Sequence, residues 1–269
     1  MIRRIKKRNI NIISKQLNNN KIGIIPTDTV TGIFAKISLE NNKKINSLKK
    51  SKEDKPLSII FSNLEEALKA VEYNKDQLEI IKENLPGKVT FILPSNKDFL
   101  RENNLYVKPE FKDSKLIFNS SLYLNELSDI LKIETDNLIS KFKSNGIFAD
   151  QEIDSDTLIN FRYIKKLLPK INIKVEEVEI YKELGIRVSL DYTLIQVLKK
   201  TGPLFTTSLN ISGNKPVENI TKRSEINELK LNTDENNKIK FFVPGKSLSS
   251  KPSTIVTFDS KNKIKLIRE

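Results

Sequence analysis

The chain has 269 residues, of which 38% are hydrophobic and 30% are charged, and its formal net charge at pH 7 is +13. That length suits one large domain or two small ones, and no run approaches the roughly 18 consecutive apolar residues that a membrane helix needs. The sequence contains neither histidine nor cysteine, which excludes imidazole bases and ligands, Ser–His and Cys–His nucleophiles, disulfides and thiolate zinc sites. We expect no signal peptide and a cytoplasmic location.

The positive charge indicates an anionic partner, such as a nucleotide or RNA. The chain is also rich in Lys, Asn and Ile, a composition that an AT-rich genome produces without any binding function. Without histidine, an enzyme must work through ammonium, guanidinium, hydroxyl, amide and carboxylate groups. Such groups suit the binding and positioning of phosphates.

Residues 1–99 alternate helical and strand patterns, which is typical of an α/β layer fold. The apolar run Ile22–Ile25 predicts a buried strand that Pro26 ends, and a loop rich in threonine follows. Open α/β sheets place ligands in such a loop, although a hydrogen-bonded turn without a ligand would look the same. The other expected elements are helices over 3–18, 42–50, 62–71 (opened by a capping box) and 75–83, and strands over 56–61 and 89–93.

The character of the chain changes near residue 100. Residues 100–180 hold 12 Lys or Arg and 14 Asp or Glu, a net charge of −2, which leaves +15 for the rest. Helices are expected over 122–131, over 136–143 with Thr135 as its cap, and over 155–168. We therefore predict that residues 1–99 and 180–269 form one discontinuous α/β domain and that residues 100–179 are an inserted all-helical subdomain.

The α/β pattern then resumes. The expected elements are a strand over 184–188, a helix capped by Asp191 and ended by Gly202, a strand over 204–207, a helix over 222–231 and strands over 241–243, 254–258 and 263–267. Four polar segments adjoin these strands, at residues 27–32, 49–57, 206–213 and 253–254. Their hydroxyl, amide and ammonium groups suit phosphate oxygens. Because no Walker or Rossmann glycine motif is present, a nucleotide site here must be of a less common type.

Seven ordered motifs carry a resemblance to a known family. They are Pro26-Thr27-Asp28-Thr29-Val30-Thr31-Gly32, Lys55-Pro56-Leu57, Leu85-Pro86-Gly87-Lys88-Val89-Thr90, Gly185-Ile186-Arg187-Val188, Thr207-Ser208-Leu209-Asn210-Ile211-Ser212-Gly213, Pro252-Ser253-Thr254-Ile255-Val256 and Leu266-Ile267-Arg268. In this order they resemble the YrdC family of L-threonylcarbamoyladenylate synthases, over roughly residues 5–98 and 180–269. The resemblance implies a YrdC-like twisted mixed sheet flanked by helices.

The resemblance also implies an activity. The family's nucleotidyltransferases join L-threonine, bicarbonate and ATP into threonylcarbamoyl-AMP and pyrophosphate, and a downstream threonylcarbamoyl transferase uses the adenylate to modify tRNA. Magnesium would arrive with ATP, tRNA or RNA could bind the basic surface, and no membrane is involved. The residues implied for substrate threonine are Thr29, Arg187 and Thr206, and those for ATP are Lys49, Lys50, Lys55, Ser208, Asn210, Ser212, Ser253 and Arg268. We assign no metal ligand and no catalytic residue.

Four positions depart from the family pattern. Ser51 stands where the family has an arginine, Glu183 places an anion where ATP would pass, Thr31 replaces an aromatic residue and Pro216 replaces a serine. The first two leave open a second reading, a non-catalytic YrdC-like module that binds RNA or nucleotide. A third, a carbamoyl-transfer accessory domain, would be expected beside further catalytic modules.

The predicted insert has a resemblance of its own. Residues 124–131 through 146–148 are similar to the small helical domain at the amino end of translation initiation factor two, and they also fit a generic helix-turn-helix. Their apolar residues suit a small core better than a binding face. The net charge of −2 argues against a strong nucleic-acid footprint.

Overall fold

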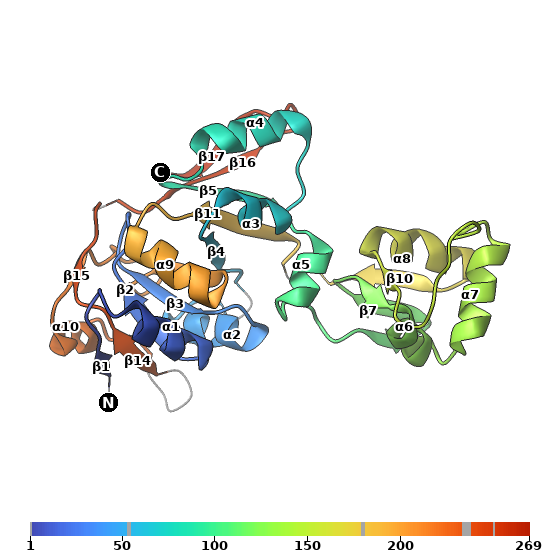
Figure 1. The fold of residues 1–269 in the computed structure, drawn as a ribbon, viewed down its shortest axis with the longest axis horizontal. Helices are drawn as coiled ribbons and strands as arrows, with labels where there is room; N and C mark the ends of the chain where they lie inside the picture. The colour runs from blue at the N-terminus through green and yellow to red at the C-terminus, as the bar shows by residue number, and fades with distance from the viewer. Residues whose placement is uncertain (1, 53–54, 179–180, 233–237, 250) are drawn as a thin grey trace. The chain divides into compact units, whose positions relative to one another are not determined.

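The computed structural model describes residues 2–52, 55–178, 181–232, 238–249 and 251–269. The chain divides into two compact units (Figure 1): Met1–Ser95 with Glu183–Glu269, and Asn96–Lys182. The second unit includes a few more residues at each end than the predicted insert at 100–179. The predicted border at 179–180 lies outside the described residues. Within the described ranges, no helix is both long and apolar enough to cross a bilayer.

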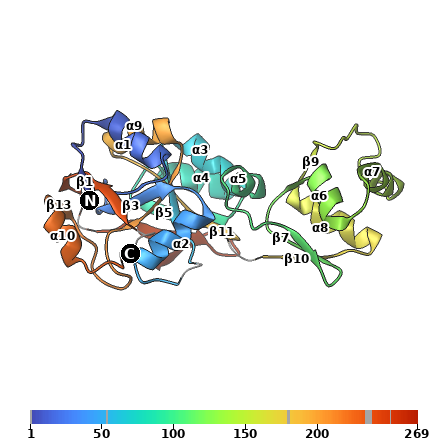
Figure 2. The same cartoon turned by 90° about the horizontal axis from the view of Figure 1, so that it is seen from below.

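A ten-stranded mixed sheet forms the centre of the first unit (Figures 1 and 2). Its order is β1-β14-β2-β3-β12-β4-β11-β5-β16-β17. The strands are β1 (Arg3–Arg4), β2 (Ile22–Ile25), β3 (Gly32–Lys36), β4 (Ser58–Phe61), β5 (Val89–Pro94), β11 (Glu183–Val188), β12 (Leu204–Ser208), β14 (Ile239–Phe242), β16 (Thr254–Phe258) and β17 (Ile264–Arg268). A mixed sheet flanked by helices confirms the predicted α/β class, and of these strands β1 and β3 were not predicted.

The helices of this unit are α1 (Ile10–Asn18), α2 (Leu39–Leu48), α3 (Leu64–Lys69), α4 (Lys75–Asn84), α9 (Tyr192–Thr201) and α10 (Arg223–Glu228). Helix α1 begins later than predicted because Arg3 and Arg4 pair with β14 as an edge strand. The predicted cap of α9 is confirmed, since Asp191 Oδ1 accepts a hydrogen bond from the Leu194 N–H at 2.9 Å. Helix α3 is capped by Asn63 rather than Ser62, because the Asn63 amide oxygen accepts from the Glu66 N–H.

One face of the sheet is shared by a hydrophobic core and by polar side chains. Leu204 packs in a cluster with side chains of α1 and α9, including Leu17 and Leu198. Side chains alternate along a strand, so Thr206 points to the same face as Leu204, and register places it opposite Ser58 of β4. The polar side chains therefore occupy the part of this face that α1 and α9 leave uncovered.

The second unit is not all-helical, which corrects the prediction. It holds α5 (Lys97–Glu102), α6 (Leu124–Leu131), α7 (Thr135–Ser144), α8 (Phe161–Leu167) and the 3-10 turn η1 (Leu168–Ile171), but also β6 (Glu110–Lys112), β7 (Lys115–Phe118) and β10 (Lys174–Glu177) in one sheet and β8 (Leu122–Tyr123) and β9 (Leu158–Ile159) in another. These strands are too short to show a clear alternation in the sequence. The core of this unit gathers Leu116, Phe118, Leu127, Phe142 and Ile164.

The helix expected over 155–168 is shorter than predicted for a local reason. The Thr157 hydroxyl donates to Asp154 Oδ1 at 2.7 Å and accepts from the Asp154 N–H, which closes a turn. Asn160 then caps α8 by accepting from the Arg162 N–H at 2.9 Å. The polar side chains of 154–160 thus compete with the helix for backbone groups.

A close approach explains the glycine inside β2. A Cβ atom on Gly23 would lie 2.1 Å from the Phe241 ring on β14, and Phe241 is fully buried. The ring crosses β2 where a side chain would otherwise stand.

Gly23→Ala should therefore destabilise the fold by about 1–3 kcal/mol through overpacking. Combining it with Phe241→Leu should cost less than the sum of the two single changes, because the smaller side chain relieves the clash. Urea unfolding of the three variants tests this, and strictly additive losses would contradict it.

Candidate functional site

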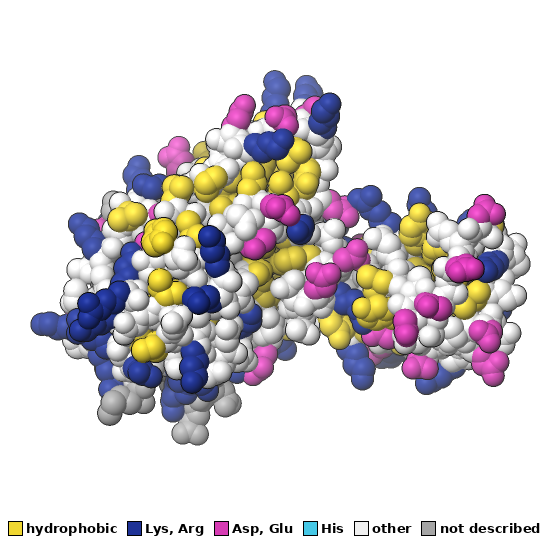
Figure 3. All heavy atoms as spheres, in the orientation of Figure 1, with side chains coloured by type: hydrophobic (Ala, Val, Ile, Leu, Met, Phe, Trp, Pro, Cys, Tyr) yellow, Lys and Arg dark blue, Asp and Glu magenta, His cyan; other side chains and the backbone are white. Residues whose placement is uncertain are grey.

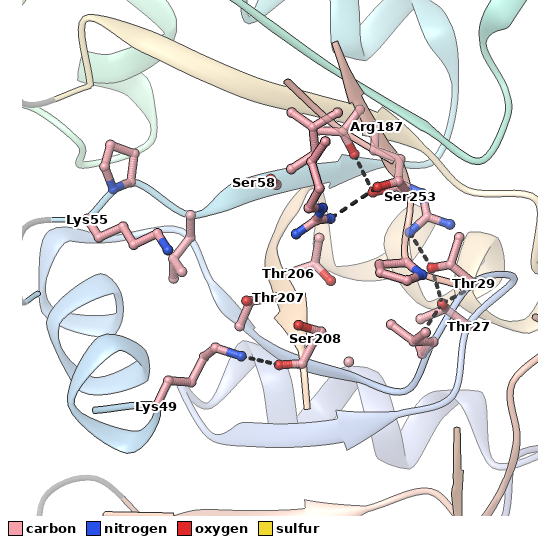
Figure 4. A pocket seen from close by; sticks show the side chains of 18 of the residues that line it. Thr27, Thr29, Lys49, Lys55, Ser58, Arg187, Thr206, Thr207, Ser208 and Ser253 are labelled. Atoms are coloured by element: carbon pink, nitrogen blue, oxygen red, sulfur yellow. Dashed lines mark hydrogen bonds between the residues drawn. The ribbon is translucent and has the colours of Figure 1, made fainter. Parts of the chain in front are cut away.

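A cavity of about 250 Å³ opens on the uncovered part of the sheet face (Figure 4). Segments far apart in the sequence line it: the threonine loop, the segment after α2, strands β4, β5, β11 and β12, and the C-terminal strands β16 and β17. Its lining contains hydroxyls, lysines and arginines but no carboxylate among the described residues. Such a lining favours anionic ligands.

A buried ion pair lies at one side of the cavity. Arg187 of β11 donates from Nη2 to Asp28 Oδ2 at 2.6 Å and from Nη1 to Thr29 Oγ1 at 2.8 Å. The two charged residues are 5% and 1% exposed. Asp28 Oδ1 and Arg187 Nε have no hydrogen-bond partner in the described part of the chain, so the pair keeps hydrogen-bonding capacity.

The hydroxyl protons of the threonine loop can be assigned from its contacts. Thr27 donates its proton to the Val30 carbonyl at 2.8 Å and accepts from the Thr29 N–H at 3.0 Å. In the 3.0 Å contact between the Thr27 and Thr29 hydroxyls, Thr29 must then be the donor. Thr29 Oγ1 also accepts from Arg187, so the loop is fixed by its own hydrogen bonds before any ligand binds.

Lys49 stands on the other side of the cavity (Figure 4). It is the C-cap of α2, directly after Leu48, and it precedes the left-handed turn at Lys50, whose φ is 54°. Its ammonium donates to the Ser208 carbonyl and, at 2.7 Å, to Asn210 Oδ1. Burial, with the nearby charges of Lys55 and Arg268, lowers the pKa of Lys49 to about 7.

The floor and the remaining wall carry hydroxyl groups and one further cation, Arg268. The Thr90 and Ser253 hydroxyls lie 2.8 Å apart, and Arg268 Nη2 donates to the Ser253 carbonyl at 3.0 Å. Gly185 leaves the floor open, because a Cβ there would lie 2.8 Å from the Ser58 hydroxyl.

Most residues implied by the resemblance meet in this cavity. Those lining it are Thr29, Lys49, Lys55, Arg187, Thr206, Ser208, Ser253 and Arg268. Asn210 is outside the lining but holds both Lys49 and the Ser208 hydroxyl, the latter at 2.7 Å.

Two residues of the predicted site lie elsewhere, and so does Glu183, which was expected beside the path of ATP. Lys50 and Ser212 are exposed and outside the lining: the left-handed turn carries Lys50 past the cavity, and Ser212 contributes a backbone N–H to the Lys49 carbonyl. Glu183 is also exposed and outside the lining, since it begins β11 opposite Pro94. Its carboxylate therefore does not stand in the cavity.

Sequence reasoning missed several lining residues, among them Asn46, Ser58, Thr90 and Ile92. Ser58 and Thr90 are polar residues within apolar strands, which was the available signal. Assigning them to the site requires the strand order and register, because β4 and β5 are separated by β11.

A family model described as telomere recombination (Sua5/YciO/YrdC) matches residues 15–108 and 161–269. The chain belongs to this family. Besides residues 1–14, the model leaves residues 109–160 unmatched, and these fall inside the second unit.

Individual relatives agree with that assignment. A Methanocaldococcus jannaschii protein with the provisional name threonylcarbamoyl-AMP synthase is 29% identical over 182 residues, 64% of this chain and 83% of the relative. Among solved structures, E. coli YciO matches with a TM-score of 0.57 at 17% sequence identity. The match covers 100% of this chain and 95% of the YciO chain. P. abyssi Sua5 complexed with L-threonine has a TM-score of 0.52 at 16% identity and covers 96% of this chain. This chain spans only 54% of that Sua5 chain, and both likenesses show the fold.

The buried ion pair generates a stability prediction. Asp28→Ala leaves the Arg187 guanidinium buried without its partner and should cost on the order of 3–5 kcal/mol. Arg187→Met should cost a similar amount, whereas the double variant should recover much of the loss. Urea unfolding measures the coupling in a double-mutant cycle; independent, small effects would contradict the pairing.

The pKa of Lys49 generates a pH prediction. Above about pH 7 the amine predominates in the free protein, and a bound polyphosphate would favour the ammonium again. Binding of tripolyphosphate at pH 8 should therefore take up a proton, and its affinity should fall as the pH rises from 7 to 9. Calorimetry in buffers of different ionisation enthalpy measures the uptake. Lys49→Gln should abolish it, and equal uptake by that variant would contradict the assignment.

Proposed function

We propose that this protein is an L-threonylcarbamoyladenylate synthase. It would condense L-threonine, bicarbonate and ATP into threonylcarbamoyl-AMP and pyrophosphate, and a downstream transferase would use the adenylate to modify tRNA. The observation that carries the proposal is the distribution of charge in one cavity. A buried arginine beside hydroxyls lies on one side, and Lys49 and Lys55 lie on the other (Figure 4). The family, and the names of the M. jannaschii relative and the Sua5–threonine structure, support the same choice.

Each side would take one substrate. Arg187 would bind the threonine carboxylate through N–H groups that Asp28 and Thr29 leave available, with Thr29 and Thr206 beside the amino acid. Lys49, Lys55 and Arg268 would bind the triphosphate, with Ser208 and Ser253 as hydroxyl contacts. This arrangement would point the threonine nitrogen and the α-phosphorus into the same cavity, where positioning contributes most to rate.

The proposed reaction does not require a histidine. Bicarbonate carboxylates the threonine nitrogen with loss of water, and a carbamate oxygen then attacks the α-phosphorus. The bond from that phosphorus to the bridging oxygen breaks, and the electron pair leaves with pyrophosphate. Cationic side chains stabilise the charge that gathers on the leaving phosphates.

Magnesium would enter as part of the substrate. The described lining of the cavity offers no carboxylate, so these residues do not form a cage for the ion. Mg²⁺ usually reaches such sites on substrate phosphates, and we assign the metal to the ATP complex.

A second candidate is a non-catalytic module that binds nucleotide or RNA. Ser51 favours it, because this residue lines the cavity where the resemblance expects arginine. A lysine can replace the charge of an arginine but not its planar, bidentate donor geometry. Such a module would bind ATP without releasing pyrophosphate.

The test is pyrophosphate release from ATP by the purified protein, with threonine and bicarbonate omitted in turn. We expect release only when both are present. ATP binding without any release would favour the second candidate.

Single substitutions test where threonine and ATP bind in the cavity. Arg187→Lys should raise the KM for threonine strongly and leave ATP binding nearly unchanged, because lysine cannot reproduce a bidentate contact. Lys55→Gln and Arg268→Gln should each raise the KM for ATP about tenfold, the loss of one charged hydrogen bond. Lys50→Gln, an exposed neighbour outside the cavity, is the matched control. An equal ATP defect in that control would show that the phosphates bind elsewhere.

A further inference from the structure

A segment that belongs to none of the seven sequence motifs holds the threonine loop in place. It follows β15 (Gly245–Lys246), and we call its residues 247–249 the strap. Two successive backbone N–H groups of the strap donate to loop carbonyls, the first to Thr27 at 3.0 Å and the second to Thr29 at 3.1 Å. The strap therefore fixes the backbone on both sides of Asp28.

One hydroxyl of the strap contacts both ends of the loop. Ser247 Oγ accepts from the Thr27 N–H at 3.4 Å and lies 3.1 Å from the Thr31 hydroxyl. Because Thr31 gives its proton to the Glu218 carbonyl at 3.1 Å, Ser247 must be the donor in the hydroxyl pair. A single side chain that is 4% exposed therefore ties residue 27 to residue 31.

The strap is itself anchored outside the ten-stranded sheet. β15 pairs with β13 (Asn219–Ile220) in a separate two-stranded sheet, and the Ser247 N–H donates to the Glu218 carbonyl at 2.9 Å. Thr31 stands where the resemblance expects an aromatic residue, and a phenyl ring there could make neither hydrogen bond of the Thr31 hydroxyl. The hydroxyl pair of Ser247 and Thr31 thus joins the loop to a support of fixed position.

We propose that Ser247 is a positioning residue for the amino-acid side of the cavity. It is outside the described lining and acts through the loop, whose Thr29 and Asp28 side chains hold the Arg187 guanidinium at 2.8 and 2.6 Å (Figure 4). A displaced loop would turn that guanidinium away from the geometry that its ligand needs. The inference rests on the proposed function in taking this ligand to be the carboxylate of threonine.

The first measurement needs no substrate, because the ¹⁵N resonances of the Arg187 guanidinium report its surroundings directly. Ser247→Ala should shift them, and Thr31→Val, which removes the other hydroxyl of the pair, should shift them in the same way. The double variant should add little to either single change. Leu248→Ala is the matched control: it removes a side chain that is 69% exposed, keeps the backbone N–H that holds Thr27, and should leave the resonances in place.

The second measurement is pyrophosphate release at varied threonine and ATP. Ser247→Ala should raise the KM for threonine about tenfold, the loss of a buried hydrogen bond, and change kcat and the KM for ATP less than about twofold. Neither Ser247→Ala nor Leu248→Ala alters the Lys and Arg side chains on the surface of the first unit (Figure 3), so the approach of anionic substrates is the same in both.

Two outcomes would overturn the inference. One is a set of Arg187 resonances that Ser247→Ala leaves unchanged. The other is a fall in kcat at an unchanged KM for threonine, which is what a merely less stable protein would give. Wild-type release of pyrophosphate with unshifted resonances in the variant would refute only this inference. Shifted resonances in a protein that releases no pyrophosphate under any condition would refute only the proposed synthase.

Discussion

The buried ion pair between Arg187 and Asp28 is the interaction on which the rest of the site depends. A guanidinium that is 5% exposed would be costly without a partner, and its partner comes from a loop 159 residues earlier in the chain. The pair therefore fixes the threonine loop against β11, and the hydroxyl network of Thr27 and Thr29 sets the details of that loop. The fixed threonine loop forms one wall of the cavity, and the Arg187 guanidinium lies beside that wall.

The described lining of the cavity bears only positive or neutral side chains, and this makes it suitable for two anionic substrates. Arg187 can meet a carboxylate while Lys49 and Lys55 meet phosphates, with the neutral hydroxyls of β12 between them (Figure 4). The protonation state of Lys49 depends on the bound ligand, because burial and neighbouring cations lower its pKa to about 7. A site of this kind would act by positioning reactants and by stabilising charge.

Much of the fold could be predicted because its signals are local. Ile22–Ile25 and Thr254–Phe258 are strands as predicted, and Asp191 caps α9 because its side chain reaches a backbone N–H three residues on. The short strands of the second unit were missed because they lack a periodic pattern of their own. The pairing of Asp28 with Arg187 depends on which strands are neighbours, and the outward position of Lys50 depends on where α2 ends. The spacing of residues in the sequence predicts neither.

The proposed synthase would join a threonine carbamate to AMP within one cavity. The most direct measurement is mass spectrometry of the adenylate formed from ATP, threonine and ¹³C-bicarbonate. We predict a nucleotide product that carries the label together with threonine, and that is lost in Arg187→Lys at limiting threonine. A product without label, or an AMP ester of threonine itself, would contradict the account.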